Sequence, residues 1–225
     1  MTQLFLYGEV NLPPIPPELL VFFESLVLKK EFNDIGYGLV HKKNNRLLKA
    51  CRYSIKSTND ILLLNWFYNN QIPVTHNNYL EPAITTNPKE ILIQTQIAYN
   101  EPSTHVVHSD IHRVFALNYM LELGGDDVLT TWYQEKNMPL RRSKNKGQYG
   151  APQQQLADTG NIEYDNLEIL GSARLEKHKW YLVATDILHD VDNIVGQRSS
   201  ITFGYYNNTI LQILKKENLL TDITE

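Results

Sequence analysis

The chain has 225 residues and a mass of 26.0 kDa, which favours one large domain because domains average roughly 150 residues. Its 42% hydrophobic and 20% charged residues, with only 11 Gly and 10 Pro, exclude collagen-like, mucin-like and low-complexity proteins. The 21 Lys and Arg against 25 Asp and Glu leave a net charge of −4. The chain as a whole therefore lacks the positive field that holds a nucleic-acid backbone.

The cysteine content and the N-terminus indicate a compartment. Cys51 is the sole cysteine, which excludes an internal disulfide and any multi-cysteine zinc or iron–sulfur site. No run of about 18 apolar residues occurs that could cross a membrane. Residues 1–10 contain Glu9 and no Lys or Arg, unlike the start of a secretory signal. We expect a cytoplasmic protein with no membrane partner.

Residues 1–90 are expected to form helical and extended segments that pack against the rest of the fold and support it. The proline-rich segment 11–17 cannot be helical, because each proline fixes φ and pushes its predecessor toward extended geometry. Residues 18–30 follow with Leu19, Phe22 and Phe23 at helical spacing, which predicts a helix packed on a core. A second helix is predicted over 59–69.

From residue 91 the pattern changes to β-branched runs with period two. It predicts strands over 91–99, 114–121, 128–133, 179–184 and 200–206. The polar stretch 135–160 predicts a long loop inside an insertion at 135–170. Residues 208–220 predict a short amphipathic helix. The expected layout is a β core over 91–206 and a C-terminal helix within 207–225.

Residues that bind metals gather at two places in this β region. His108-Ser-Asp110 is the first, and on an extended segment residues two apart point to the same face. His189 is the second, and Arg198-Ser-Ser200 follows nine positions later at the start of an apolar strand. Arg198 and Ser200 are expected to share one strand face for the same reason.

The order His-x-Asp, His and a basic residue resembles the Fe(II)- and 2-oxoglutarate-dependent oxygenases, and the spacing after His189 looks closest to their prolyl-hydroxylase-like branch. The segments Gly124-Gly125 and Thr130–Tyr133 also look like the turn and strand that follow the triplet in that family. The resemblance implies a mainly β fold with flanking helices, a double-stranded β-helix or jelly roll. It also implies Fe(II), 2-oxoglutarate as co-substrate, dioxygen, and hydroxylation of a further substrate.

The resemblance implies that the metal ligands are His108, Asp110 and His189. Such a set leaves three positions open on the metal, enough for a chelating 2-oxo acid and dioxygen. Arg198, expected to be buried, would pair with the distal carboxylate of 2-oxoglutarate, because a planar guanidinium suits bidentate pairing. The further candidate contacts to 2-oxoglutarate are Ser200, Tyr133, Thr131 and Asn118.

Two other interpretations of these residues stay open. One is a non-catalytic metal-binding jelly roll, against which Arg198 argues. The other is a zinc hydrolase that uses His108, Asp110 and His112, which share a face if the strand is regular. Asp190 is interpreted as solvated or bonded to backbone, and the basic run 141–146 as a solvated loop or a lid over an anionic substrate. The prime substrate is expected to be a peptide side chain or small molecule rather than nucleic acid, and the sequence leaves the oligomeric state open.

Overall fold

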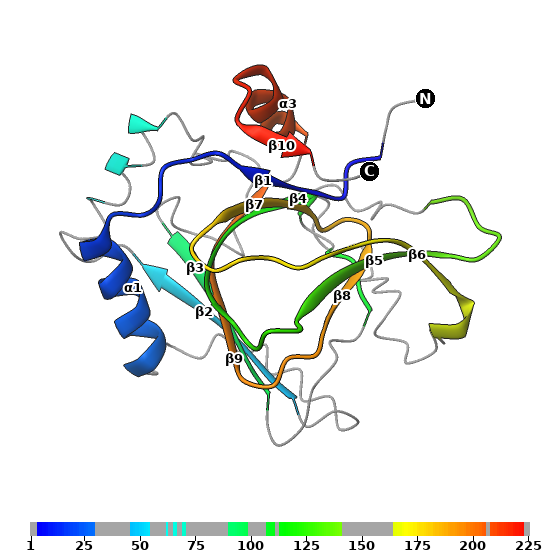
Figure 1. Ribbon diagram of the computed structural model, residues 1–225, viewed down its shortest axis with the longest axis horizontal. Helices are drawn as coiled ribbons and strands as arrows, with labels where there is room; N and C mark the ends of the chain where they lie inside the picture. Colours follow the sequence, from blue (N-terminus) through cyan, green and yellow to red (C-terminus); the bar gives the residue numbers. More distant parts are fainter. Residues whose placement is uncertain are drawn as a thin grey trace.

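A computed structural model describes residues 4–29, 46–54, 62, 65–66, 69–70, 90–98, 107–110, 113–140, 164–205 and 208–222. These residues form two antiparallel β-sheets, one of seven strands and one of three, with two helices at the periphery (Figure 1). No helix in these ranges is both long and apolar enough to cross a membrane.

The large sheet brings strands from both ends of the chain together. Its order is β10 (Leu220–Asp222), β1 (Tyr7–Val10), β7 (Trp180–Ala184), β4 (Phe115–Leu123), β9 (Gln197–Tyr205), β3 (Glu90–Ala98) and β2 (Arg46–Ser54). The three-stranded sheet has the order β6 (Leu167–Ala173), β5 (Leu129–Glu135) and β8 (Leu188–Asp192). An isolated bridge joins His108 to β8 at the edge of this small sheet.

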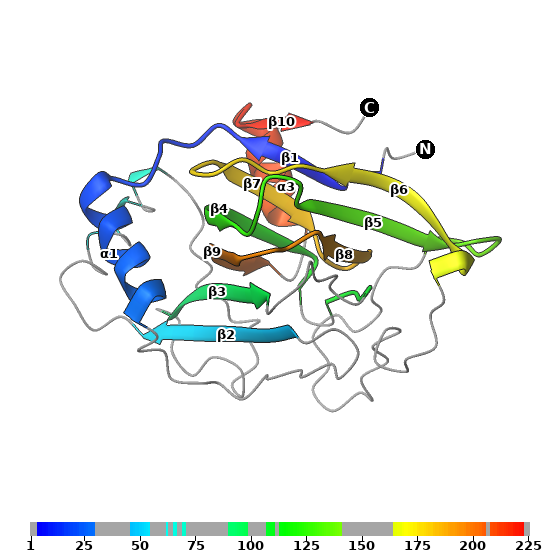
Figure 2. The same cartoon turned by 60° about the horizontal axis from the view of Figure 1, so that its bottom comes forward.

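The chain passes repeatedly between the two sheets. It runs from β3 in the large sheet to His108 beside the small one, returns to β4, enters β5 and β6, and then alternates through β7, β8 and β9. Eight extended segments wound in this way make a double-stranded β-helix, or jelly roll. The predicted fold class is confirmed. Figure 2 shows the two layers with the small sheet beside β4 and β9.

Both predicted helices at the ends of the described chain are present. α1 spans Pro17–Lys29, one residue earlier than expected, and its first turn bonds to the carbonyl of Pro16. It buries Leu19 and Phe23 in the main core, and Figure 1 shows it near the ends of β2 and β3. α3 spans Thr209–Lys216 and buries Ile210 and Leu214. The amphipathic patterns of both helices therefore predicted their buried faces.

Several elements were not expected from the sequence. β1 and β2 arise within the N-terminal ninety residues and extend the large sheet, and β10 follows α3. The predicted insertion 135–170 ends in a short 3-10 helix, Tyr164–Asn166, and the beginning of β6. β6 buries only its terminal residues Leu167 and Ala173, so it lacks the apolar alternation that marks a strand. The predicted helix 59–69 and the basic run 141–146 lie mostly or wholly outside the described residues.

The main core lies against the large sheet and contains two tryptophans. Trp132 and Trp180 are almost fully buried, and their indole N–H groups donate to the carbonyls of Ala184 and Pro13. Trp66 stacks on Trp180 with ring centroids 5.7 Å apart. Buried indoles need such partners because an unpaired N–H is unfavourable away from water.

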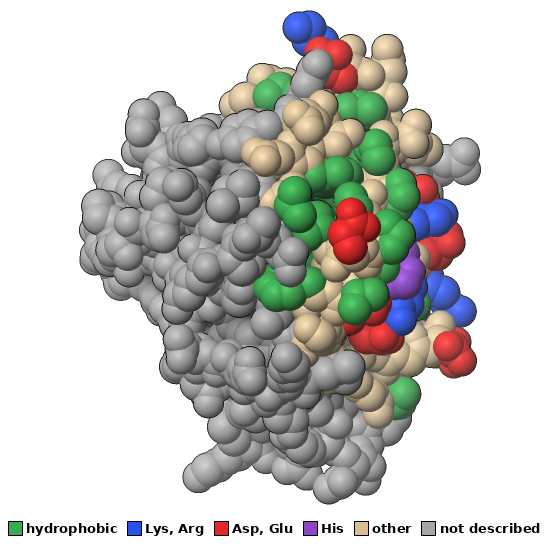
Figure 3. All heavy atoms as spheres, turned by 90° about the vertical axis from the view of Figure 1, so that its left-hand side faces the viewer, with side chains coloured by type: hydrophobic (Ala, Val, Ile, Leu, Met, Phe, Trp, Pro, Cys, Tyr) green, Lys and Arg blue, Asp and Glu red, His purple; other side chains and the backbone are tan. Residues whose placement is uncertain are grey.

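The described surface on the α1 side carries charges of both signs. Figure 3 shows acidic and basic side chains interspersed along one edge of this face, with hydrophobic side chains beside them. Exposed pairs include Lys177 with Glu122 at 2.6 Å and Lys179 with Glu9 at 3.1 Å. Surface pairs of this kind add little to the stability of the fold, because water screens them. As far as it is described, this face is not the uniformly basic surface that nucleic acids require.

Candidate functional site

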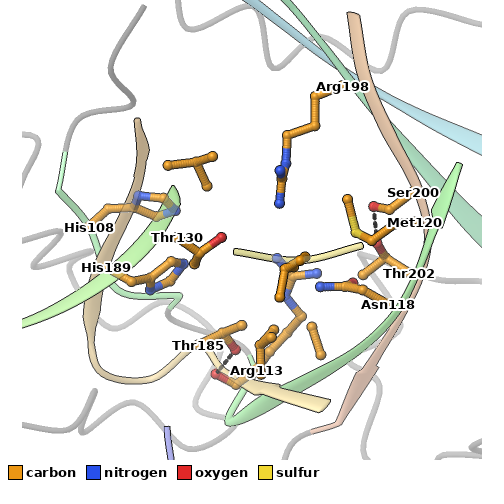
Figure 4. Close-up of a pocket in the computed structure, with 14 residues that line it drawn as sticks. His108, Arg113, Asn118, Met120, Thr130, Thr185, His189, Arg198, Ser200 and Thr202 are labelled. Carbon is orange, nitrogen blue, oxygen red and sulfur yellow. Dashed lines mark hydrogen bonds between the residues drawn. The ribbon is translucent and has the colours of Figure 1, made fainter. Parts of the chain in front are cut away.

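A cavity of about 90 Å³ lies between the two sheets (Figure 4). By the same measure one water needs roughly 10–15 Å³, so the cavity admits a small molecule. Its polar lining residues are His108, Arg113, Asn118, Thr130, Thr185, His189, Arg198, Ser200 and Thr202. Among the described lining residues there are two arginines, two histidines and no carboxylate. The cavity is therefore suited to an anion.

The large sheet forms one wall of the cavity. Because side chains alternate between the two faces of a strand, every second residue of β4 and β9 faces this cavity. On β4 and β9, Asn118 pairs with Thr202 and Met120 pairs with Ser200, and directly opposite residues share a face. All four line the cavity. Ser200 Oγ and Thr202 Oγ1 lie 3.0 Å apart and bond to each other. The expected shared face of Arg198 and Ser200 is confirmed, because both line the cavity.

The opposite wall carries two imidazoles held side by side. The backbones of His108 and His189 exchange both N–H···O=C bonds, at 2.9 and 2.7 Å. In such an antiparallel pair the two side chains point to the same face. The ring centroids are 4.5 Å apart, and Figure 4 shows both rings on the wall across from Ser200 and Thr202. Residues 81 positions apart therefore meet because the jelly roll pairs their strands.

The His189 ring is held in one tautomer. Its Nδ1 lies 2.8 Å from the carbonyl oxygen of Ile187, and since a carbonyl only accepts, Nδ1 must carry the hydrogen. Burial and, to a smaller extent, nearby His108 lower the pKa of His189 to about 4, although Asp110 opposes the shift. The ring is therefore neutral at neutral pH, with Nε2 as its acceptor. A metal-binding histidine commonly has this arrangement.

Asp110 lies next to the imidazole pair and carries a charge. Its Oδ1 is 4.0 Å from His108 Nε2, and its Oδ2 accepts from Arg113 Nε at 2.9 Å and lies 2.7 Å from Arg113 Nη2. Burial alone would raise the pKa of this carboxyl, but Arg113 and the two imidazoles outweigh that effect and lower it below its usual range. Asp110 is thus an ionised carboxylate beside the two imidazoles.

The three predicted metal ligands, His108, Asp110 and His189, lie near one another but do not surround a common metal position. Among the described residues, no group of three or more His, Cys, Asp or Glu side chains is already arranged to hold a metal ion. Two ligand atoms on adjacent positions of one metal lie about 3 Å apart, given bonds of roughly 2.0–2.2 Å. Asp110 Oδ1 would have to approach His108 by about 1 Å.

Arg198 lies close to two turns that are joined by backbone hydrogen bonds. The carbonyl of Gly124 in the β4–β5 turn accepts from the N–H groups of Val195 and Gly196, which precede β9. Gly124 and Gly125 have φ of +89° and +145°, values that favour glycine. Arg198 Nη1 donates to the carbonyl of Leu123 at 3.3 Å, and Figure 4 shows the guanidinium pointing into the cavity. Arg198 is half-buried rather than buried as expected.

Thr131 and Tyr133 do not line the cavity, which corrects the sequence-based assignment. On β5, Trp132 lies opposite His189, so the even-numbered residues share the face of that histidine. Thr130 therefore lines the cavity instead, while Thr131 and Tyr133 point to the other face. Thr131 bonds to Ser172. A shift of one residue exchanges the two faces of a strand, and all four residues 130–133 are buried, so no apolar alternation marks the correct face.

Tyr133 belongs to a buried cluster around Asp190, on the face of the small sheet away from the cavity. The carboxyl oxygens of Asp190 accept from the Tyr133 hydroxyl at 3.1 and 3.2 Å and from the Tyr164 hydroxyl at 3.0 Å. Burial raises the pKa of both phenols, and the Asp190 carboxylate raises it further, so both stay protonated donors. Asp190 is fully buried, which corrects the expectation of a solvated or backbone-bonded side chain.

Replacing Asp190 by alanine is expected to destabilise the fold by about 1–3 kcal/mol, because it leaves the buried Tyr133 hydroxyl without its acceptor. Urea denaturation would measure the change. Asp165, exposed and in the same 3-10 helix as Tyr164, is the matched control. Asp165→Ala should stay within about 0.5 kcal/mol of the parent. Equal effects of the two substitutions would contradict a structural role for the Asp190 cluster.

Comparison with known proteins adds the following. No family model and no curated protein matches the sequence. Several solved structures are similar in fold, among them the following two. One is a prolyl-4-hydroxylase from Pseudomonas putida, with a TM-score of 0.45 and 10% identity over 88% of this chain and 90% of that one. The other is the Fe(II)/alpha-ketoglutarate-dependent dioxygenase TqaL, with a TM-score of 0.33 and 11% identity over 84% and 74%.

The candidate site therefore rests on its own geometry. The structure brings His108, His189, Asn118, Arg198 and Ser200 around one cavity, with Asp110 beside it. It adds Thr130, Thr185, Thr202 and Arg113, none of which the sequence analysis selected. Arg113 directly follows His112 and lies three residues after Asp110, a spacing that could have drawn attention to it. His112, the third ligand of the zinc-hydrolase alternative, lies outside the described residues.

Proposed function

We propose that this cavity binds Fe(II) and 2-oxoglutarate, and that the protein is a 2-oxoglutarate-dependent dioxygenase. It would couple the conversion of 2-oxoglutarate and dioxygen into succinate and carbon dioxide to hydroxylation of a prime substrate, a peptide side chain or small molecule. The observation that carries the proposal is the pair of imidazoles His108 and His189 at one wall of a cavity into which Arg198 points and whose described lining residues include no carboxylate.

The donor set suits a ferrous ion. His108, His189 and Asp110 offer two imidazole nitrogens and one carboxylate oxygen, the set typical of non-haem iron sites with open positions. The bond from His189 Nδ1 to Ile187 orients that ring, and the bonds from Arg113 to Asp110 Oδ2 orient the carboxylate. Such outer contacts commonly hold metal ligands in place. When bound, the iron would activate dioxygen for substrate oxidation.

The rest of the cavity suits a short dicarboxylate. Arg198 supplies a guanidinium for its distal carboxylate, and Ser200, two residues on along the same strand face, supplies a hydroxyl. Thr130 and Asn118 each have a buried oxygen without a hydrogen-bond partner among the described residues. Buried polar atoms normally have partners, so these two point to a polar ligand in the cavity.

Anaerobic addition of 2-oxoglutarate to the Fe(II)-loaded protein is expected to produce a weak visible metal-to-ligand charge-transfer band. The band requires chelation of the metal by a carboxylate and a ketone oxygen together. Glutarate, which has both carboxylates and no ketone, is the control and should produce none. A protein fully loaded with iron that shows no band with 2-oxoglutarate would overturn the proposal.

A further inference from the structure

Arg113 reaches into the cavity from the segment between Asp110 and β4. Two of its guanidinium nitrogens, Nε and Nη2, are engaged by Asp110 Oδ2. Its backbone is fixed as well, because its carbonyl accepts from Thr185 Oγ1 at 3.1 Å. Figure 4 shows the Arg113 and Arg198 side chains reaching into the cavity from opposite sides. The guanidinium is thus held in place at the end of the cavity near the imidazoles.

The third nitrogen of this guanidinium, Nη1, has no hydrogen-bond acceptor among the residues that the structure describes. This nitrogen is also buried. Leaving a buried donor of a charged group unpaired is strongly unfavourable. The Asn118 and Thr130 oxygens in the same cavity are likewise unpaired. A bound ligand with an anionic oxygen would satisfy Nη1.

The backbone of β9 makes room for this side chain. Gly204 lies opposite Ala116 of β4, and a Cβ atom added to Gly204 would stand 2.6 Å from Cδ and 3.1 Å from Cγ of Arg113. Atoms at 2.6 Å overlap, and Cδ lies in the middle of the side chain, so the arginine would have to move. The position of the Arg113 guanidinium therefore depends on a glycine in the neighbouring strand.

We propose that Arg113 is a second carboxylate-binding residue, which binds through Nη1 the carboxylate next to the ketone of a 2-oxo acid while Arg198 binds the distal carboxylate. The inference rests on the proposed function and deepens it. Arg113 lies beside Asp110 and the imidazoles, where the 2-oxo end of the ligand would have to be. Two separate guanidinium contacts would make the cavity selective for 2-oxo dicarboxylates.

The test measures binding of two ligands by isothermal titration to Mn(II)-loaded protein under anaerobic conditions. The ligands are 2-oxoglutarate and 2-oxopentanoate, which has the same chain length and a methyl group in place of the distal carboxylate. Arg113→Ala should weaken both by a similar factor, roughly tenfold to hundredfold. Arg198→Ala should weaken only 2-oxoglutarate, to about the level of 2-oxopentanoate. Metal content is measured in every sample.

Two further variants separate ligand binding from the support that Arg113 gives to Asp110. Arg113→Lys keeps a positive charge for Asp110 but lacks the planar fork, so metal content should persist while both ligands bind more weakly. Gly204→Ala displaces the arginine without removing it and should also weaken both ligands. Gly196→Ala, whose Cβ would meet its nearest neighbour at 3.8 Å, is the matched control and should bind as the parent does.

The outcomes separate the two proposals. If the parent protein binds neither ligand, the proposed function is overturned and this inference with it. If the parent binds 2-oxoglutarate, and the Arg113→Ala and Arg113→Lys variants bind both ligands as tightly as the parent does at equal metal loading, the inference alone is overturned. Arg113 would then serve only to hold Asp110.

Discussion

Arg198→Ala is expected to weaken binding of 2-oxoglutarate to the metal-loaded protein by roughly 30- to 150-fold, corresponding to about 2–3 kcal/mol. The expected loss is moderate because Arg198 is half-buried, so water partly replaces the lost contact. A fully buried pair would lose about 3–5 kcal/mol. Metal content should remain nearly unchanged, because Arg198 is not one of the three proposed metal ligands and its Nη1 donates to the carbonyl of Leu123. Isothermal titration and metal analysis would measure both quantities.

Related variants test whether the loss belongs to the guanidinium itself. Arg198→Lys should lose less affinity, because the charge remains and only the planar fork is gone. Ser200→Ala should lose less again, about 0.5–1.5 kcal/mol for one hydrogen bond. Arg174, exposed and paired with Asp127 on the surface, is the matched control, and Arg174→Ala should bind as the parent does. An Arg198→Ala protein with parental affinity would mean that the co-substrate lies elsewhere.

His189→Ala is expected to abolish stoichiometric binding of Fe(II). The substitution removes one of the two imidazoles and leaves the His108 ring without its neighbour at 4.5 Å. Measuring iron after anaerobic dialysis against a weak chelator would show the loss. His178, an exposed histidine near Glu24, is the matched control, and His178→Ala should retain iron.

His112→Ala distinguishes the oxygenase from the zinc-hydrolase interpretation of the same motif. If His189 is a ligand, His112→Ala should retain far more metal than His189→Ala. The reverse order would favour a site made of His108, Asp110 and His112, and would contradict the proposed function. Because dialysis compares metal content directly, the result does not depend on knowing the prime substrate.

Local rules were sufficient for several features of this protein. Helical spacing of Leu19 and Phe23 after a proline-rich segment predicted α1 within one residue. The period of two along a strand was enough to place Arg198 and Ser200 on one face, because strand geometry alternates side chains whatever the fold. The order of His108, Asp110, His189 and Arg198 led to the jelly roll through a family resemblance, and the sheet topology confirms that fold.

Local patterns along the chain thus predict where residues lie within each element, whereas the folded arrangement of the strands sets which faces and partners they meet. Thr130 rather than Thr131 lines the cavity because β5 pairs Trp132 with His189, and β5 is buried on both faces. Asp190 bonds to Tyr133 and Tyr164 across separations of 57 and 26 residues. Pairings of this kind depend on strand register and chain packing, which local periodicity does not encode.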